Sequence, residues 1–144
     1  MNLNKENGIT IIALIITIIL MLILAGVGMH FGSDAVNKAK LEDIKTDMIS
    51  IKTKAQIIAE QYNFKDIDSL VGTQITDTEA TKLGITNNEN VRKWSSQDLS
   101  NQGLSTIKGD IYIVNYSLED IKACEVYYLE GYEGKYSLTE LQDL

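Results

Sequence analysis

The sequence contains no proline, one cysteine (Cys124) and one histidine (His30). A single cysteine excludes a disulfide within the chain, and these two residues alone cannot supply a usual zinc ligand set. We find no nucleophile and base at a recognisable spacing and no glycine-rich phosphate loop. The acidic pairs in the chain are too sparse in oxygen ligands to predict a calcium loop. We therefore expect no enzymatic activity, no metal and no cofactor.

Charged residues are absent between Glu6 and Asp34. Within that interval, residues 9–29 are apolar or glycine except for Thr10 and Thr17. A helix of this stretch, rising about 1.5 Å per residue, is about 32 Å long, which is enough to cross the hydrocarbon core of a bilayer. Backbone groups in lipid must be satisfied within their own segment, so the stretch predicts a transmembrane helix.

Three kinds of N-terminal segment contain such a stretch. A cleaved secretory signal has a shorter apolar core, a basic start and a small-residue cleavage site, and Ala25-Gly26-Val27-Gly28 matches that site poorly. A plain single-pass anchor fits the length. The third kind has a short polar leader that ends in glycine just before the apolar helix, and here the leader MNLNKEN is followed by Gly8.

This third pattern resembles the type IV pilin family, which includes the pseudopilins of type II secretion and competence systems. The resemblance covers residues 1–33. It implies that a prepilin peptidase cleaves after Gly8 on the cytoplasmic face and that the new N-terminal residue, Ile9, is methylated. It also implies an assembly platform protein and an ATPase as indirect partners, and a filament of pilin subunits at the cell surface after a stage in the cytoplasmic membrane.

The chain departs from the family pattern at two positions. The family usually begins its mature chain with Phe, where this sequence has Ile9, and carries Glu at the fifth mature position, where it has Ala13. That Glu is thought to neutralise the N-terminal amine of a neighbouring subunit, because an unpaired charge in an apolar environment is costly. Its absence favours a minor or divergent subunit. Gly26 and Gly28 are small enough to let neighbouring helices approach closely.

The remainder of the chain is acidic, since the formal net charge of −7 lies outside the apolar stretch. An acidic domain without a basic stripe repels phosphates, so we expect no binding to nucleic acid. A second helical pattern runs from Ser33 to Tyr62. No glycine or proline interrupts it between Asp34 and Tyr62. Its apolar positions recur every three or four residues and form one stripe: Ile44, Met48, Ile51, Ala55, Ile58 and Tyr62. The stripe predicts packing against the domain's own sheet in preference to a coiled-coil partner.

Residues 63–106 contain short helical patterns and loops. We expect a helical turn at 66–70 ended by Gly72, a helix capped by Thr76 or Asp77 that ends at Gly84, and another after Ser95 or Ser96. Trp94 should be buried against the helix stripe. Alternation of period two begins after residue 107 and predicts about three antiparallel strands, followed by a turn or small helix after Ser137 or Thr139.

These patterns predict an α+β fold in which a long N-terminal helix, half membrane-spanning and half amphipathic, packs on a small antiparallel sheet. Its parts are a cleaved leader (1–8), a transmembrane or filament-core helix (9–32), an amphipathic helix (33–62), a variable region (63–106), and the sheet with its tail (107–144). Two functions remain open: a subunit of a pilus-like or pseudopilus filament, or a membrane-anchored extracellular binding module that does not polymerise.

Overall fold

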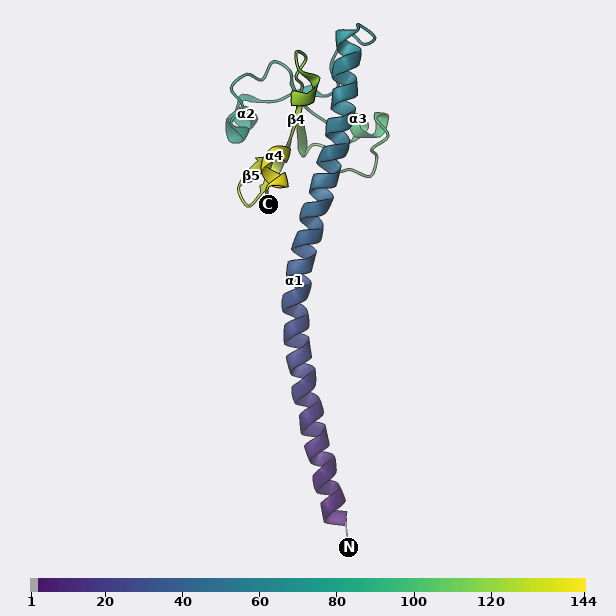
Figure 1. Ribbon diagram of the computed structural model, residues 1–144, viewed down its shortest axis with the longest axis vertical. Coiled ribbons are helices and arrows are strands. Elements are labelled where there is room, and N and C mark those ends of the chain that lie inside the picture. The colour runs from purple at the N-terminus through teal and green to yellow at the C-terminus, as the bar shows by residue number, and fades with distance from the viewer. Residues whose placement is uncertain (1–2) are drawn as a thin grey trace. The chain divides into compact units, whose positions relative to one another are not determined.

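The computed structural model describes the backbone of residues 3–144, together with the side chains of residues 10–24 and 36–144. Helix α1 (Leu3–Asn63) contains the whole apolar stretch and the amphipathic stripe (Figure 1). The chain divides into two compact units, residues 1–40 and 41–144. The first unit is helical throughout its described backbone, whereas the second contains the last part of α1 and all the strands. An α+β fold is therefore confirmed.

The sheet has five strands rather than the three that the sequence predicts. They follow each other in the order β1-β2-β3-β4-β5, every neighbouring pair being antiparallel. Their bounds are β1 (Thr73–Gln74), β2 (Val91–Lys93), β3 (Tyr112–Asn115), β4 (Glu125–Tyr132) and β5 (Lys135–Ser137). The alternating pattern of the sequence correctly predicted the last three strands, β3, β4 and β5. It did not predict β1 and β2, because two or three residues are too few to show an alternation.

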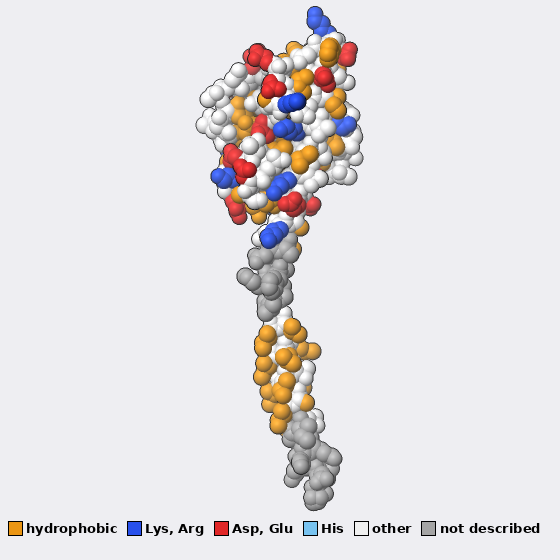
Figure 2. Space-filling model, in the orientation of Figure 1, with side chains coloured by type: hydrophobic (Ala, Val, Ile, Leu, Met, Phe, Trp, Pro, Cys, Tyr) orange, Lys and Arg blue, Asp and Glu red, His pale blue; other side chains and the backbone are white. Residues whose placement is uncertain are grey.

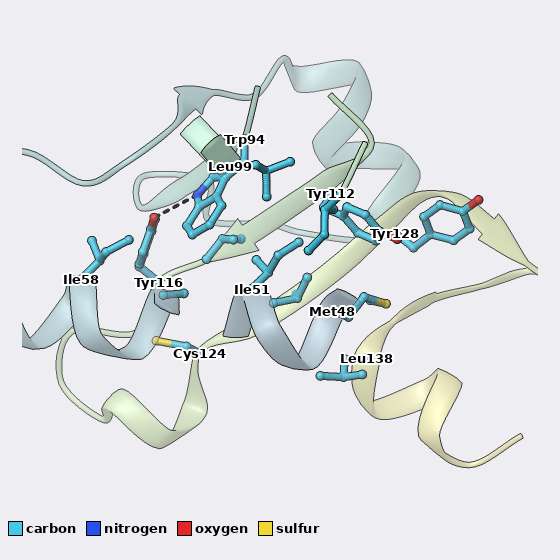
Figure 3. Close-up of a cluster of buried hydrophobic side chains, with 14 of the residues drawn as sticks. Met48, Ile51, Ile58, Trp94, Leu99, Tyr112, Tyr116, Cys124, Tyr128 and Leu138 are labelled. Atoms are coloured by element: carbon cyan, nitrogen blue, oxygen red, sulfur yellow. Dashed lines mark hydrogen bonds between the residues drawn. The ribbon is translucent and has the colours of Figure 1, made fainter. Parts of the chain in front are cut away.

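One face of the sheet packs against the amphipathic part of α1. Five of the six stripe residues are buried, and Tyr62, at the end of the helix, is half-buried. Trp94 is fully buried in the same cluster, as the sequence predicts. Figure 3 shows Met48, Ile51 and Ile58 of α1 among Trp94, Leu99 and the tyrosines of the sheet. The stripe is therefore the domain's own core face.

The opposite face of the sheet has a smaller core of its own, formed by Ile75, Ala80, Val91 and Ile113. Helix α2 (Asp77–Leu83) covers it and lies on the side of β4 away from α1 (Figure 1). The alternation of β3 explains the two cores, because Tyr112 and Val114 belong to the larger cluster and Ile113 to the smaller one.

The short helices begin where hydroxyl side chains cap them, as the sequence predicts. Thr76 and Glu79 form a reciprocal capping box at α2, and Gly84 ends this helix with a left-handed φ of 72°. Ser95 caps α3 (Ser96–Asn101), and Ser137 caps α4 (Leu138–Gln142). A single 3-10 turn, η1 (Ile121–Ala123), precedes β4.

The expectation of a helical turn at residues 66–70 is wrong, because residues 66–69 form bends and residue 70 is irregular. Here α1 ends in a Schellman motif: the amide of Asp66 donates to the carbonyl of Gln61 at 2.9 Å, and that of Lys65 to Tyr62 at 3.1 Å. Gly72 does not cap a helix. A Cβ at this position would lie 2.6 Å from the Cβ of Arg92, so glycine is required by the close approach to β2.

Among the side chains that the structure describes, we find no helix with the length and apolarity needed to cross a membrane.

Candidate assembly surface

The apolar part of α1 exposes its side chains in every direction in the described range 10–24. All of these residues are exposed, and the large apolar ones have between 48% and 69% of their surface accessible (Figure 2). The larger members are Ile11, Ile12, Leu14, Ile15, Ile16, Ile18, Ile19, Leu20, Met21, Leu22, Ile23 and Leu24. An apolar surface of this extent is not left in water by a soluble monomer, so it marks an interaction site.

Ala13 lies within this surface, on the helix and exposed. The hydroxyl of Thr17 donates a 2.8 Å hydrogen bond to the carbonyl of Ala13, one helical turn earlier. The hydroxyl is thereby satisfied inside its own helix, so Thr17 can be covered by apolar groups without leaving an unpaired donor. Residues 10–24 include no ionisable side chain, which leaves nothing there to neutralise an amine.

The other residues that the sequence assigns to processing and assembly are Gly8, Ile9, Gly26 and Gly28. All four lie within the bounds of α1 but outside the described side chains, as does His30. Cleavage after Gly8, methylation of Ile9 and close helix approach at the two glycines stay predictions.

Two neighbouring tyrosines of the sheet, Tyr112 of β3 and Tyr128 of β4, each donate a hydrogen bond to a carboxylate. The hydroxyl of Tyr112 donates to Asp47 at 3.3 Å, and that of Tyr128 donates to Glu130 at 2.8 Å. The two rings lie 5.6 Å apart. Burial raises the pKa of Tyr112 and is also the main cause that raises the pKa of Asp47, while burial and Glu130 raise the pKa of Tyr128 to about 12. Both tyrosines are therefore neutral hydrogen-bond donors, but only Tyr112 links α1 to the sheet, whereas Tyr128 bonds within β4.

Cys124 is buried, just before β4, and its sulfur both accepts from the amide of Ser117 at 3.3 Å and approaches the Ser117 carbonyl at 3.7 Å. Burial raises the pKa of the thiol above its ordinary value. Since the thiolate is the reactive form, this cysteine has the surroundings of a structural residue.

Two pockets of the domain are open to solvent. One, of about 470 Å³, is lined by residues of α2, and the other, of about 360 Å³, lies beside the end of α1 and is lined by Tyr62, Asn63, Lys65, Ile67 and Asp68. In residues 10–24 and 36–144, no three His, Cys, Asp or Glu side chains are grouped so that they could hold a metal ion. Neither hollow brings together the elements of a catalytic site.

The outward side of α1 within the domain is a surface that the sequence patterns did not predict. Ile49 and Ile57 are exposed there, on the side of the helix opposite the buried stripe. Ile49 and Ile57 each lie four residues from Thr53, and this spacing already places all three on one side of a helix.

Comparisons of this chain with protein-family models, with curated proteins and with solved structures found no match.

Proposed function

We propose that this chain is a structural subunit, minor or divergent, of a type IV pilus-like or type II secretion pseudopilus filament. The observation that carries the proposal is the apolar surface of residues 10–24, which is exposed on all sides of α1. Fully burying a large apolar side chain contributes about 1.5–3 kcal/mol, and the twelve large side chains here already hide part of their surface in the helix. Covering the remainder would still contribute on the order of 10 kcal/mol, which favours a lipid or protein environment around the helix.

The leader in front of this surface supports a filament over a permanent anchor. A polar segment ending in Gly8, directly before the apolar run, is the pattern that prepilin peptidase recognises in the family that this chain resembles. In the proposal, the chain waits in the cytoplasmic membrane, loses residues 1–8, and leaves the bilayer when its helix packs against those of other subunits. A packing that repeats without closing yields an open helical polymer.

The absence of a charge at Ala13 supports the proposal that this chain is a minor or divergent subunit. If a neighbouring subunit's terminal amine lay beside residues 10–24 of this chain, none of their side chains could neutralise it. An unpaired charge in an apolar bundle is costly. The proposal therefore places this subunit where no such amine faces it, for example at a filament end, or next to a subunit that carries the missing carboxylate.

The test is the N-terminal mass and sequence of the full chain from its native membrane, with prepilin peptidase present and absent. The proposal expects a mature chain beginning at methylated Ile9 only when the peptidase is present. An intact Met1 in both samples would overturn it and favour the alternative, a membrane-anchored extracellular module that does not polymerise. A start between Val27 and Ser33 would instead indicate a secreted protein.

A further inference from the structure

The second of the two open pockets lies where α1 ends and the chain turns (Figure 1). We call it the α1-end hollow; it is lined by Tyr62, Asn63, Lys65, Ile67 and Asp68. One short segment of the chain therefore builds the whole hollow. Its volume of about 360 Å³ falls within the range of about 300–1,000 Å³ that is usual for small-ligand sites.

The shape of the α1-end hollow is fixed by hydrogen bonds of its own segment. The Schellman motif at the end of α1 holds the backbone, since the amides of Lys65 and Asp66 both donate back to the helix. The side-chain amide of Asn63 donates to the carbonyl of Leu118 at 2.8 Å, which ties the turn to the loop after β3. A ligand therefore meets a preformed site, and little ordering of the chain opposes binding.

One part of the lining is apolar and anchored. Tyr62 and Ile67 are both half-buried, and both pack against the main core of the domain. Their exposed parts form an apolar wall that cannot easily retract. Such a wall favours the C–H groups of a ligand, because covering it removes apolar surface from water.

The rest of the lining consists of polar groups that the chain itself does not use. In the part of the chain that the structure describes, the side chains of Lys65 and Asp68 and the hydroxyl of Tyr62 make no hydrogen bond or ion pair. The Asn63 amide donates to Leu118, so its oxygen is left as an acceptor. The hollow thus offers acceptors at Asp68 and Asn63, a donor at Lys65, and both at Tyr62.

The hollow beside α2 lacks this arrangement. There the hydroxyl of Thr81 donates to the carbonyl of Asp77 at 2.9 Å, and the ammonium of Lys82 lies 5.7 Å from the centre of the Tyr136 ring. Its donors are therefore engaged by the chain itself. This hollow carries the same two kinds of charge as the α1-end hollow, which makes it a matched control site.

The lining indicates the chemistry of the ligand. A sugar ring has C–H groups for the apolar wall and adjacent hydroxyls, two of which can donate to one carboxylate while a lysine donates to their oxygens. An extended peptide presents N–H groups on one edge only about every 6.6 Å, twice the rise per residue, so two of them do not reach one carboxylate. We infer that the α1-end hollow binds a neutral carbohydrate.

The charges near the hollow favour a neutral sugar over an acidic one. Positions 60–68 contain one lysine, Lys65, against three carboxylates, Glu60, Asp66 and Asp68. A sialylated or sulfated sugar would be repelled by this excess of negative charge. The inference does not depend on filament assembly, because a membrane-anchored module could bind the same ligand.

The experiment applies the labelled full chain to an array of immobilised neutral, sialylated and sulfated glycans. The chain is kept in a detergent without a sugar head group, because such a head group would compete for the hollow. We expect binding to a subset of the neutral glycans, and competition by the same glycan in free form. Binding to no glycan, or to the acidic ones alone, would overturn the inference.

Two variants test whether the α1-end hollow is the site. Asp68→Ala and Lys65→Gly should each weaken binding about tenfold, because each removes a charged hydrogen-bonding group from the lining. Lys65 has a φ of 62°, which glycine adopts without strain, so Lys65→Gly is not expected to lose stability. Thermal unfolding of both variants should confirm that a loss of binding does not arise from a loss of folding.

Asp77→Ala and Lys82→Ala are the matched controls. They remove the same two kinds of charge from the hollow beside α2, where both residues are exposed, and should leave binding unchanged. Equal losses in the two pairs of variants would show that binding depends on surface charge in general and would overturn the inference. Binding that survives both Asp68→Ala and Lys65→Gly would overturn it too, because the sugar would then lie elsewhere.

Discussion

The indole Nε1 of Trp94 donates a hydrogen bond of 3.1 Å to the hydroxyl of Tyr116 (Figure 3). That hydroxyl donates in turn to the carbonyl of Val71 at 2.8 Å. Both aromatic side chains are buried. The relay joins the residue that follows β2, the residue that follows β3 and the segment before β1, which are far apart in the sequence. One phenol oxygen therefore satisfies the buried indole N–H of Trp94 and the carbonyl of half-buried Val71.

Tyr116→Phe should destabilise the domain by about 1–3 kcal/mol, because it leaves the Trp94 donor and the Val71 acceptor without their partner. The free energy of unfolding of the full chain in detergent, measured with urea, checks this expectation. Tyr132→Phe is the matched control, since the Tyr132 hydroxyl makes no hydrogen bond in the described part of the chain. Similar losses for both variants would show that the relay adds nothing to stability.

Lys65→Gly should stabilise the domain by about 1 kcal/mol. Lys65 has a φ of 62° in the Schellman motif that ends α1, a conformation in which a Cβ is unfavourable and glycine is not. The gain is reduced by the greater freedom of glycine in the unfolded chain. Lys122→Gly, in η1, lacks the positive φ and should instead be destabilising. Thermal unfolding of the two variants separates these outcomes, and a loss of stability in Lys65→Gly would contradict the prediction.

Glu79→Ala should destabilise the domain by about 1 kcal/mol at neutral pH, because Glu79 accepts from the amide of Thr76 at 3.0 Å and pairs with Lys93 at 2.9 Å. The Thr76 amide is the main cause that lowers the pKa of this carboxyl. Its contribution is therefore present above the pKa of the unfolded chain and is lost as the pH falls through the lower pKa of the folded chain. Urea unfolding over a range of acidic pH should show the difference from the unsubstituted chain shrinking. Glu79→Gln keeps the acceptor but not the charge, so it should lose less.

The contribution of Asp47 to stability should depend on pH in the opposite sense to that of Glu79, and Asp47→Asn tests this. Burial raises the pKa of Asp47, so the folded chain holds its proton up to a higher pH than the unfolded chain does. Stability associated with this group therefore falls as the pH rises through the interval between the two pKa values. At neutral pH the Asp47→Asn chain should be the more stable, because the amide oxygen can still accept from Tyr112 and no charge is partly buried at this position. Asp68→Asn, at an exposed position, is the control. A variant that is less stable at pH 7 would contradict the prediction.

Local signals in the sequence were enough to place much of the fold. The cap of α2 depends on Thr76, Glu79 and Gly84, which are close neighbours in the chain, and the stripe of α1 depends only on helical spacing. What the sequence could not reveal depends on distant partners. β1 and β2 exist because Thr73 pairs with Lys93 and because β2 pairs with β3. Gly72 resembled a helix cap, but its role is set by Arg92, twenty residues later.

The candidate assembly surface was predictable in one part and not in the other. Residues 10–24 contain no charged side chain, and this composition alone predicts an apolar contact surface. The outward side of α1 within the domain is mostly polar by composition, and whether its hydroxyl groups are satisfied depends on where Thr46, Ser50 and Thr53 donate. Side-chain bonds to the backbone compete with bonds to water, and a sequence does not say which is made.

Ala13→Glu should change assembly if a neighbouring subunit presents a free N-terminal amine to this position. The side chain at 13 is exposed on the apolar helix, so a carboxylate there would be stabilised by an amine and costly without one. The proposed minor role predicts that the variant alters the ratio of this subunit to its partners in isolated filaments. Quantitative mass spectrometry of those filaments measures the ratio, and Ala13→Gln, polar but uncharged, is the control. An unchanged ratio and yield in Ala13→Glu would contradict the prediction, because a carboxylate at this exposed apolar position should be either stabilised by an amine or costly without one.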